Sequence, residues 1–191
     1  MTSEEYDFLL FDRIEKIKSI NQEYNLEKNA YLSFSGGKDS TVLHYLIDLA
    51  LPNNKIPRLY INTGIEYLDV VNFVREMAEV DERIEIINSG VNIKKMLEEN
   101  GYPFKSKEHS LKVHYYQRGL MPRFVVNYIS EGKSFSCPKS LLYQFEKGFD
   151  LKISDLCCYK LKKDVAKKWS KEKDKRISLT GMRNEEGGAK S

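Results

Sequence analysis

The sequence predicts an α/β fold in which a parallel sheet is covered by helices on both faces. Short apolar runs alternate along the chain with longer segments whose apolar residues recur every three or four positions. Strands separated by helices are joined by right-handed crossovers, which make the strands parallel and place helices on both faces. The chain contains no internal repeat, and its 191 residues are enough to bury a real core.

The first half of the chain contains two expected strands and three expected helices. A helix is expected over residues 4–24, with Ser3 as a candidate N-cap. The strands are expected over residues 30–34 and 58–61, because both runs are short and apolar. The helix after the first strand should turn inward Val42, Leu43, Leu46 and Ile47. The helix expected over residues 67–80 should turn inward Val70, Val71, Val74 and Met77.

The second half is less regular in its middle. A strand is expected over residues 83–87, followed by a helix over residues 93–100 that Gly101 ends. Residues 102–156 are expected to form short helices and loops rich in Tyr and Phe. A lysine-rich helix over residues 159–173 precedes a last strand over residues 176–180. Apolar residues recur every four positions in the lysine-rich helix, namely Leu161, Val165 and Trp169, so it is predicted to be amphipathic.

Composition limits the class of protein. Hydrophobic residues make up 41% and charged residues 31%, which is typical of a globular chain. The net charge of +3 is too small to indicate a polyanionic partner by itself. The acidic N-terminus has no signal-peptide pattern, and no apolar run is long enough for a membrane span. Three cysteines and no export signal favour a reducing compartment, so a cytoplasmic protein without a membrane partner is expected.

The junction after the first expected strand is typical of a phosphate-binding turn. It reads Ser35-Gly36-Gly37-Lys38-Asp39-Ser40 and leads directly into a helix. Glycines at 36 and 37 allow backbone N–H groups to close on an anion, and the helix directs its free N–H groups and positive dipole end to the same point. Lys38 adds a mobile positive charge. Asp39 could cap the helix or bind a metal ion, and Ser35 and Ser40 offer hydroxyl donors. The alternative is a tight connection whose polar residues only cap the helix. The turn is not a Walker A loop, because the spacing of its glycines differs.

Four motifs in order resemble those of the phosphoadenosine phosphosulfate (PAPS) reductase family. The six-residue turn resembles the PP-loop, S-G-G-x-D-S, of the adenine-nucleotide alpha-hydrolase-like superfamily. "YINTGIEYLDV" resembles the D-T-G-x-x-[FY]-P-E segment, although Asn62, Leu68 and Asp69 replace its Asp, Pro and Glu. "DLCCYKLKKDVAKKW" resembles the Cys-Cys-x-x-x-K segment. "LTGMRNEEGGAKS" resembles the T-G-x-R-x-x-E-S-x-x-R segment, with Gly187 and Lys190 in place of Ser and Arg.

The resemblance implies a fold and a set of nucleotide contacts. It implies a doubly wound sheet of strand order 3-2-1-4, as in the HUP fold, within a single PP-loop domain over residues 1–191. The nucleotide, namely ATP, PAPS or adenosine phosphosulfate, would lie across the ends of the first, second and fourth strands. The implied phosphate- and nucleotide-binding residues are Ser35, Gly36, Gly37, Lys38, Asp39, Ser40, Thr63, Gly64, Gly181, Arg183 and Glu186. Lys38, Asp39 and Arg183 are the implied catalytic residues, and Mg²⁺ is a candidate cofactor. The alternative for Arg183 and Glu186 is a surface ion pair in a terminal loop.

Other charged and titratable residues have weaker patterns. Lys105 and Lys107 are candidates for a second anion site, and solvated lysines are the alternative. The basic helix makes a nucleic-acid partner a weak candidate. His44 has no partner motif and is expected to be packed, while His109 and His114 lack the third ligand of a zinc site.

The cysteines limit the sulfur chemistry that the resemblance implies. Cys157 and Cys158 match the pair that some family members use, with a later C-x-x-C, to hold a [4Fe–4S] cluster. That later pair is absent from the sequence, so no cluster is expected, and packed cysteines, including Cys137, are the alternative. Sulfonucleotide reductases continue into a region with a nucleophilic cysteine. The sequence is therefore compatible with a truncated chain that lacks this C-terminal extension or with a short relative of different activity.

Three functions remain open at this stage. The first is sulfonucleotide reduction or sulfur transfer, with a sulfur donor or a thioredoxin-like reductant as partner. The second is an ATP pyrophosphatase that adenylates a tRNA, DNA or small-molecule acceptor and releases pyrophosphate. The third is a nucleotide-binding subunit or sensor without turnover. The sequence does not indicate an oligomeric state.

Overall fold

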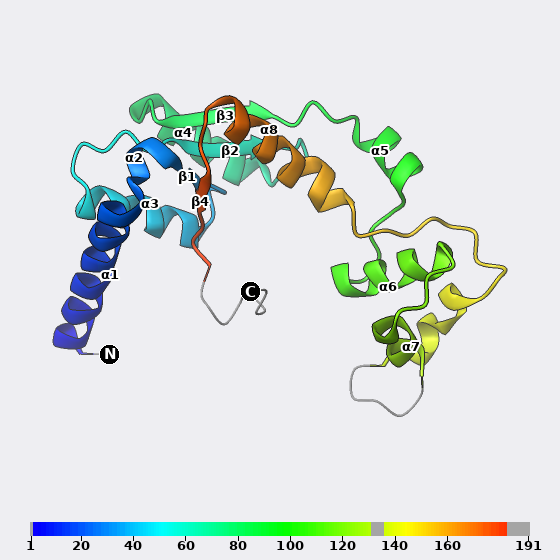
Figure 1. Cartoon of the computed structure of the whole chain (residues 1–191). Helices are drawn as coiled ribbons and strands as arrows, with labels where there is room; N and C mark the ends of the chain where they lie inside the picture. The colour runs from blue at the N-terminus through cyan, green and yellow to red at the C-terminus, as the bar shows by residue number, and fades with distance from the viewer. Residues whose placement is uncertain (1, 131–135, 183–191) are drawn as a thin grey trace. The chain divides into compact units, whose positions relative to one another are not determined.

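The computed structural model describes residues 2–130 and 136–182, and its sheet has the expected order. Four parallel strands are arranged β3-β2-β1-β4. Their bounds are Ala30–Ser33 for β1, Arg58–Asn62 for β2, Ile84–Asn88 for β3 and Ile177–Leu179 for β4. Figure 1 shows helices around this sheet. The predicted α/β class, the parallel sheet and the order 3-2-1-4 are confirmed.

The helices of the described residues follow the predicted alternation. They are α1 Ser3–Tyr24, α2 Leu26–Asn29, α3 Lys38–Ala50, α4 Leu68–Val80, α5 Ile93–Asn100, α6 Lys107–Gln117, α7 Arg123–Ile129 and α8 Asp164–Glu172. A 3₁₀ helix spans Lys139–Phe145, and a π-helical turn, Tyr159–Lys163, precedes α8. The cap residue of α5 is Gly101, with φ 99°, which is the conformation that favours glycine. In the described part of the chain, no helix is long and apolar enough to cross a membrane.

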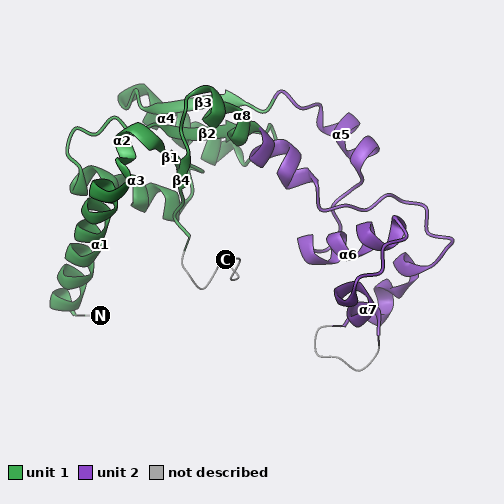
Figure 2. Ribbon diagram, viewed as in Figure 1, with its two compact units in different colours: residues 1–89, 165–191 green, residues 90–164 purple. Residues whose placement is uncertain are grey.

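The chain divides into two compact units, which Figure 2 shows in different colours. Unit 1 consists of residues 1–89 and 165–191 and contains the sheet. Unit 2 consists of residues 90–164 and lies in the connection between β3 and β4. Whether residues 1–191 behave as one domain stays a prediction.

The sheet of unit 1 is covered on both faces because successive residues of a strand point to opposite sides. Ala30 and Leu32 of β1 face a cluster that includes Ile47 of α3 and Val74 of α4. Tyr31, between them, faces Leu59 and Trp169 of α8 instead. The Tyr31 and Trp169 rings meet edge to face, with centroids 5.2 Å apart. The apolar pattern Leu161, Val165 and Trp169 is therefore a packing pattern, as expected for an amphipathic helix, since Leu161 and Trp169 are buried.

Two local expectations need correction. The N-cap of α1 is Thr2 rather than Ser3, because the Thr2 side chain accepts from the Glu5 N–H and the Glu5 side chain accepts from the Thr2 N–H. Val42 does not face the core and is 53% exposed. The buried residues of α3 are Ser40, His44, Ile47 and Ala50, and the predicted Leu43 packs, partly buried, against the same core.

Unit 2 has an apolar core of its own. Val113 of α6, Val125 of α7 and Ile153 belong to one buried cluster. His109 lies within it, with Nδ1 2.9 Å from the Tyr128 hydroxyl and Nε2 2.9 Å from Gln144 Oε1. Both ring nitrogens have partners, so His109 is a packed polar residue, as the absence of a zinc pattern suggested.

Candidate phosphate site at the carboxyl edge of the sheet

The six-residue turn joins the carboxyl end of β1 to the first turn of α3. Because all four strands are parallel, the segments that follow β2 and β4 emerge at the same edge. Thr63 and Gly64 follow β2, and Gly181 follows β4. The structure thus places these predicted residues at one edge of the sheet of unit 1.

The two glycines of the turn have different geometric roles. Gly36 has φ +70°, and a Cβ built there would lie 2.6 Å from Cγ2 of Val74 and 3.0 Å from Cγ1 of Val70. The turn therefore packs directly against α4, which only glycine permits. Gly37 is the N-cap of α3 with φ −82°, and a Cβ there would meet only the Ser35 hydroxyl, at 3.3 Å.

The two serines stabilise the turn from within. The Ser40 hydroxyl donates to the Gly37 carbonyl at 2.9 Å and accepts from the Ser35 N–H at 3.2 Å. Because the Ser40 proton is directed to Gly37, the Ser35 hydroxyl is the donor in the 3.0 Å contact between the two side chains. Ser35 Oγ also accepts from the Gly37 N–H at 3.3 Å. These hydroxyls hold the backbone of the turn in shape. Their expected donation to a phosphate stays a prediction.

The N-terminus of α3 is open to an anion. Gly37 provides no side-chain cap, and within residues 2–130 and 136–182 no side chain accepts from the N–H groups of Lys38, Asp39 or Ser40. Lys38 and Asp39 are exposed, and neither forms an ion pair within residues 2–130 and 136–182. Free N–H groups, a positive helix end and a mobile ammonium group are what a phosphate requires.

The segment after β2 is held by a residue that the sequence did not single out. The buried Thr63 donates from its N–H to Glu66 Oε2 at 3.0 Å and from its hydroxyl to Glu66 Oε1 at 2.7 Å. Gly64 has φ +83° and donates to Asn62 Oδ1 at 3.0 Å. Glu66 therefore orders this loop, and the exposed backbone of Gly64 is its accessible part. An acidic residue three positions after Thr63 could have indicated this loop brace.

Gly181 lies against the start of α3. A Cβ at Gly181 would lie 2.5 Å from the Asp39 carbonyl oxygen and 3.0 Å from the Ser40 nitrogen. Glycine lets the chain after β4 approach the first turn of α3 closely. Arg183 and Glu186 of the same predicted segment lie outside the described residues, as do Gly187 and Lys190.

A cavity of about 680 Å³ borders the lysine of the turn. Lys38, Asp39 and Gly181 line it together with Arg13 and Lys16 of α1. The positions of Arg13 and Lys16 could not be predicted, because their spacing is also that of an ordinary exposed helix face. The cavity therefore contains three cationic side chains, two of them from α1.

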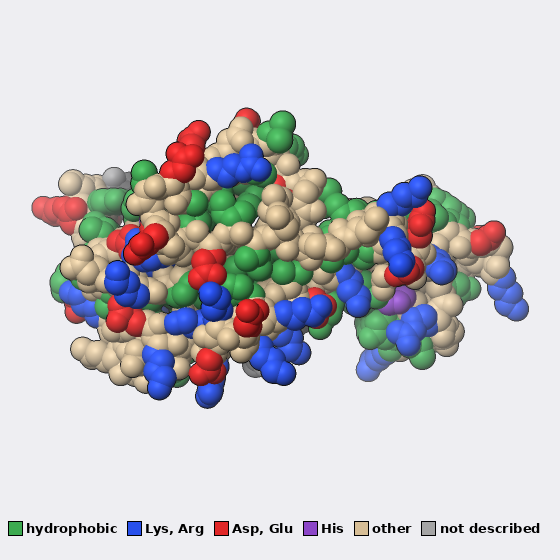
Figure 3. Space-filling view, turned by 90° about the horizontal axis from the view of Figure 1, so that it is seen from above, with side chains coloured by type: hydrophobic (Ala, Val, Ile, Leu, Met, Phe, Trp, Pro, Cys, Tyr) green, Lys and Arg blue, Asp and Glu red, His purple; other side chains and the backbone are tan. Residues whose placement is uncertain are grey.

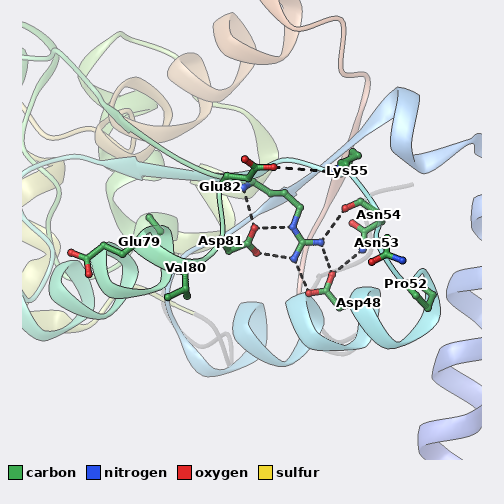
Figure 4. A pocket seen from close by; sticks show the side chains of 11 residues that line it. Asp48, Pro52, Asn53, Asn54, Lys55, Glu79, Val80, Asp81 and Glu82 are labelled. Atoms are coloured by element: carbon green, nitrogen blue, oxygen red, sulfur yellow. Dashed lines mark hydrogen bonds and ion pairs between the residues drawn. The ribbon is translucent and has the colours of Figure 1, made fainter.

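His44 belongs to a buried ion network at the other end of the strands, opposite the six-residue turn. Its ring nitrogen Nδ1 accepts from Arg58 Nε at 3.3 Å. Asp48 accepts from Arg58 Nη2 at 2.7 Å and from Arg83 Nη1 at 2.8 Å, and Arg83 Nη2 lies 2.8 Å from Asp81. Figure 4 shows Asp48 and Asp81 directed toward one guanidinium group. Arg58 begins β2 and Arg83 precedes β3, so the network lies at the amino ends of these strands.

Burial and charge shift the pKa values in this network. Burial lowers the pKa of His44, and the charge of Arg58 lowers it further. Burial alone would raise the pKa of Asp48, but hydrogen bonds from Arg83 and Asn54 and the charges of Arg58 and Arg83 lower it to about 2. Ligand atoms of His44, Asp48 and Asp81 lie within 4.8 Å of one another, as in a metal site. Two guanidinium groups already neutralise these carboxylates, so the arrangement fits a structural role and not a cation site.

In unit 2, residues from two separate predictions, the second anion site and the cysteine pair, lie around the same cavity. Lys105, Lys107, Cys157 and Cys158 line one cavity of about 380 Å³. Cys137 is buried in the apolar cluster of unit 2, where burial raises the pKa of its thiol. A [4Fe–4S] cluster takes four thiolates, and the chain has three cysteines. Among the described residues, the cysteines also form no group with three ligand atoms within 4.8 Å of one another. This set does not fit such a cluster.

Comparisons with known proteins agree with the site. The sequence model of one protein family, the phosphoadenosine phosphosulfate reductase domain, matches residues 29–121. These residues include the six-residue turn and the segment after β2. An alignment over 103 positions, which covers 49% of this chain, is 33% identical to an uncharacterized protein of Methanocaldococcus jannaschii. The aligned stretch spans a quarter, 25%, of that relative's length. No solved structure matches the chain. Residues 29–121 therefore belong to the phosphoadenosine phosphosulfate reductase domain family, within the PP-loop, adenine-nucleotide alpha-hydrolase-like superfamily.

Proposed function

We propose that the protein binds an adenine nucleotide at the PP-loop and uses it in sulfonucleotide reduction or sulfur transfer. The observation that carries the proposal is the open N-terminus of α3 beside two glycines and the exposed Lys38. Backbone N–H groups and a helix end of this kind bind phosphate oxygens without a conformational change. The family match supports an adenylyl or sulfonucleotide ligand in preference to another phosphate.

The proposed roles of the residues follow from their chemistry. Lys38 would pair with a phosphate or sulfate oxygen and stabilise charge that develops there. Asp39, exposed in the first turn of α3, fits a carboxylate ligand of Mg²⁺, which when bound neutralises phosphate charge. Gly64 and Gly181 would admit the nucleotide close to the backbone. Arg183 and Glu186 are proposed on the family pattern alone.

A second candidate is an ATP pyrophosphatase that adenylates an acceptor. All three cysteines of the chain, Cys137, Cys157 and Cys158, belong to unit 2, and unit 1 contains none. The PP-loop unit itself thus offers charged groups but no thiol. Positioning and charge stabilisation without a nucleophilic residue are sufficient for attack on an adenylyl phosphate.

The test of the phosphate site is the substitution Lys38→Ala. Loss of a charge-assisted hydrogen bond should weaken binding of ATP or PAPS by roughly 1.5–3 kcal/mol, or roughly 10- to 100-fold. Lys94→Ala, which removes an exposed lysine of α5, is the matched control and should leave affinity unchanged. Calorimetry with both nucleotides measures the difference. Unchanged affinity in a folded Lys38→Ala protein would contradict the phosphate site.

Product analysis separates the functions. Sulfite release from PAPS in the presence of a reduced dithiol protein supports the reductase. Pyrophosphate release from ATP and Mg²⁺ that depends on an added acceptor supports the pyrophosphatase. Tight nucleotide binding with neither product supports a binding subunit or sensor.

A further inference from the structure

Unit 2 contains a cavity that combines two cations with two thiols. The cavity has a volume of about 380 Å³, and its lining includes Lys105, Ser106, Lys107, Asp155, Cys157 and Cys158. The first three residues precede or begin α6, and the last three lie some fifty positions later in the sequence. Folding of unit 2 is therefore what brings the lysines and the thiols together.

The lysine side of the cavity is suited to an anion. Ser106 is the N-cap of α6, and its hydroxyl accepts from the His109 N–H at 3.1 Å. Lys105 has φ 56°, a conformation that is unusual for a residue other than glycine. Both lysines are exposed, and neither forms an ion pair with a described residue. Two ammonium groups without a carboxylate partner among the described residues thus flank the positive end of an eleven-residue helix.

Two acidic groups lie near these lysines. Glu108 forms an ion pair with Lys112. Asp155 lies 3.5 Å from Nδ1 of His114. With two lysines against the one carboxylate of Asp155, the charge of the lining is positive.

The thiol side of the cavity has the features of a reactive site. Cys158 is exposed and Cys157 is half-buried, and both are free thiols. Unreactive cysteines are among the most buried residues, as Cys137 is here. Reactive cysteines lie in partly exposed, positively charged surroundings, because such surroundings favour the thiolate. Cys158 is exposed and lines the same cavity as Lys105 and Lys107.

We propose that this cavity accepts a sulfane sulfur from an inorganic sulfur anion of the thiosulfate type. Lys105 and Lys107 hold the oxyanion, and the Cys158 thiolate attacks the terminal sulfur. A bond forms between Cys158 Sγ and that sulfur, the sulfur–sulfur bond of the donor breaks, and sulfite leaves with the electron pair. Cys158 is left as a persulfide, so the step requires no further oxidant or reductant. The proposal rests on the sulfur-transfer form of the proposed function and names the class of sulfur donor.

The experiment treats the reduced full chain with thiosulfate in the absence of oxygen and measures its mass. We expect a gain of one sulfur atom at Cys158, located by peptide mapping and removed by a thiol reductant, together with one equivalent of sulfite. Cys158→Ser should lose the gain, and Cys137→Ser should keep it. The double variant Lys105→Asn with Lys107→Ala should slow the reaction about tenfold or more, because the local positive charge concentrates the anion. Asn is chosen at 105 because it tolerates a positive φ.

The result that would overturn the proposal is a chain that gains no sulfur, or one that gains it equally fast without the two lysines. Iron and acid-labile sulfide bound through Cys157 and Cys158 would also overturn it. Lys38→Ala separates this proposal from the proposed function, because it should weaken nucleotide binding roughly 10- to 100-fold and leave persulfide formation intact. Nucleotide binding without persulfide formation would contradict only the thiol site, and the converse would contradict only the nucleotide site.

Discussion

At the scale of single residues, alanine substitutions at Gly36 and Gly37 test how far the PP-loop depends on each glycine. At Gly36 an alanine would adopt φ +70° and place its Cβ 2.6 Å from Val74. We expect Gly36→Ala to lower the free energy of unfolding by about 2 kcal/mol or more, since the left-handed conformation alone costs about 1–2 kcal/mol. Gly37→Ala should cost under about 1 kcal/mol, because its φ of −82° suits any residue. Urea denaturation of both variants measures the difference, and equal losses would contradict this geometry.

Asp48 connects the acid stability of the fold to the network of Arg58 and Arg83. The pKa of Asp48 is lowered to about 2 in the folded chain, against about 3.9 for a free side chain. Its stabilisation is therefore present above about pH 4 and lost as the pH falls toward 2, and it amounts to at most ~2.5 kcal/mol. The side chain is 31% exposed, so solvent reduces this amount further.

The matching substitution is Asp48→Asn. It leaves the fully buried guanidinium of Arg58 without its carboxylate, so we expect a loss of about 3 kcal/mol at neutral pH. The pH dependence of the unfolding free energy between 4 and 2 should become shallower. Glu98→Gln on the exposed face of α5 is the control and should change neither quantity. A variant with the slope of the parent chain would mean that Asp48 does not titrate as described.

At the scale of elements, α8 shows how a lysine-rich helix can have a structural role. Trp169 packs on Tyr31 and donates from Nε1 to Glu85 Oε2 at 3.0 Å. We expect Trp169→Ala to destabilise unit 1 by about 3–5 kcal/mol. Lys167→Ala, on the exposed side of the same helix, should stay within about 0.5 kcal/mol. Denaturation followed by circular dichroism compares the two, and a large loss at Lys167 would show that the helix depends on its charges.

The charged surface around this helix also bears on the candidate nucleic-acid partner. Figure 3 shows Lys and Arg side chains interspersed with Asp and Glu over the face that it presents. Lys173 lies 3.5 Å from Glu85, and the Lys175 ammonium donates to the carbonyls of Glu27 and Lys28. These two lysines thus have local partners, which leaves fewer free cations to contact the phosphate backbone of a nucleic acid.

The elements could be predicted from the sequence because their signals are local. Apolar spacing indicated α3 and α4, and Gly101 indicated the end of α5. The inner face of α3 was partly missed, because Ser40 and His44 are buried by partners from other segments, such as Ser35 and Arg58. Likewise, the sequence indicated the glycine-rich turn, but it did not indicate that Glu66, Arg13 and Lys16 lie near the site. The positions of Arg13 and Lys16 depend on long-range packing, for which a single sequence carries no local pattern. Glu66, by contrast, braces Thr63 three positions before it, which is a local pattern.

At the scale of the whole molecule, the main feature is a second core formed by the segment that connects β3 to β4 in the sequence. Unit 2 makes up most of the connection between β3 and β4, so unit 1 is discontinuous in sequence. Each unit has its own buried cluster, around Leu32 and Val74 in one and around Val113 and Val125 in the other. Because the two clusters share no residue, loss of packing in one need not weaken the other.

Matched valine substitutions test whether the two units unfold separately. Val74 in unit 1 and Val113 in unit 2 are both fully buried, so Val→Ala should cost about 2 kcal/mol at each. Trp169, the one tryptophan of the chain, belongs to unit 1, so its fluorescence reports that unit. We expect Val74→Ala to lower the fluorescence midpoint in urea and Val113→Ala to leave it unchanged. Hydrogen exchange of α6 should accelerate only in Val113→Ala. If both substitutions shift both probes equally, the chain unfolds as one cooperative domain over residues 1–191, and separate cores do not make separate folding units.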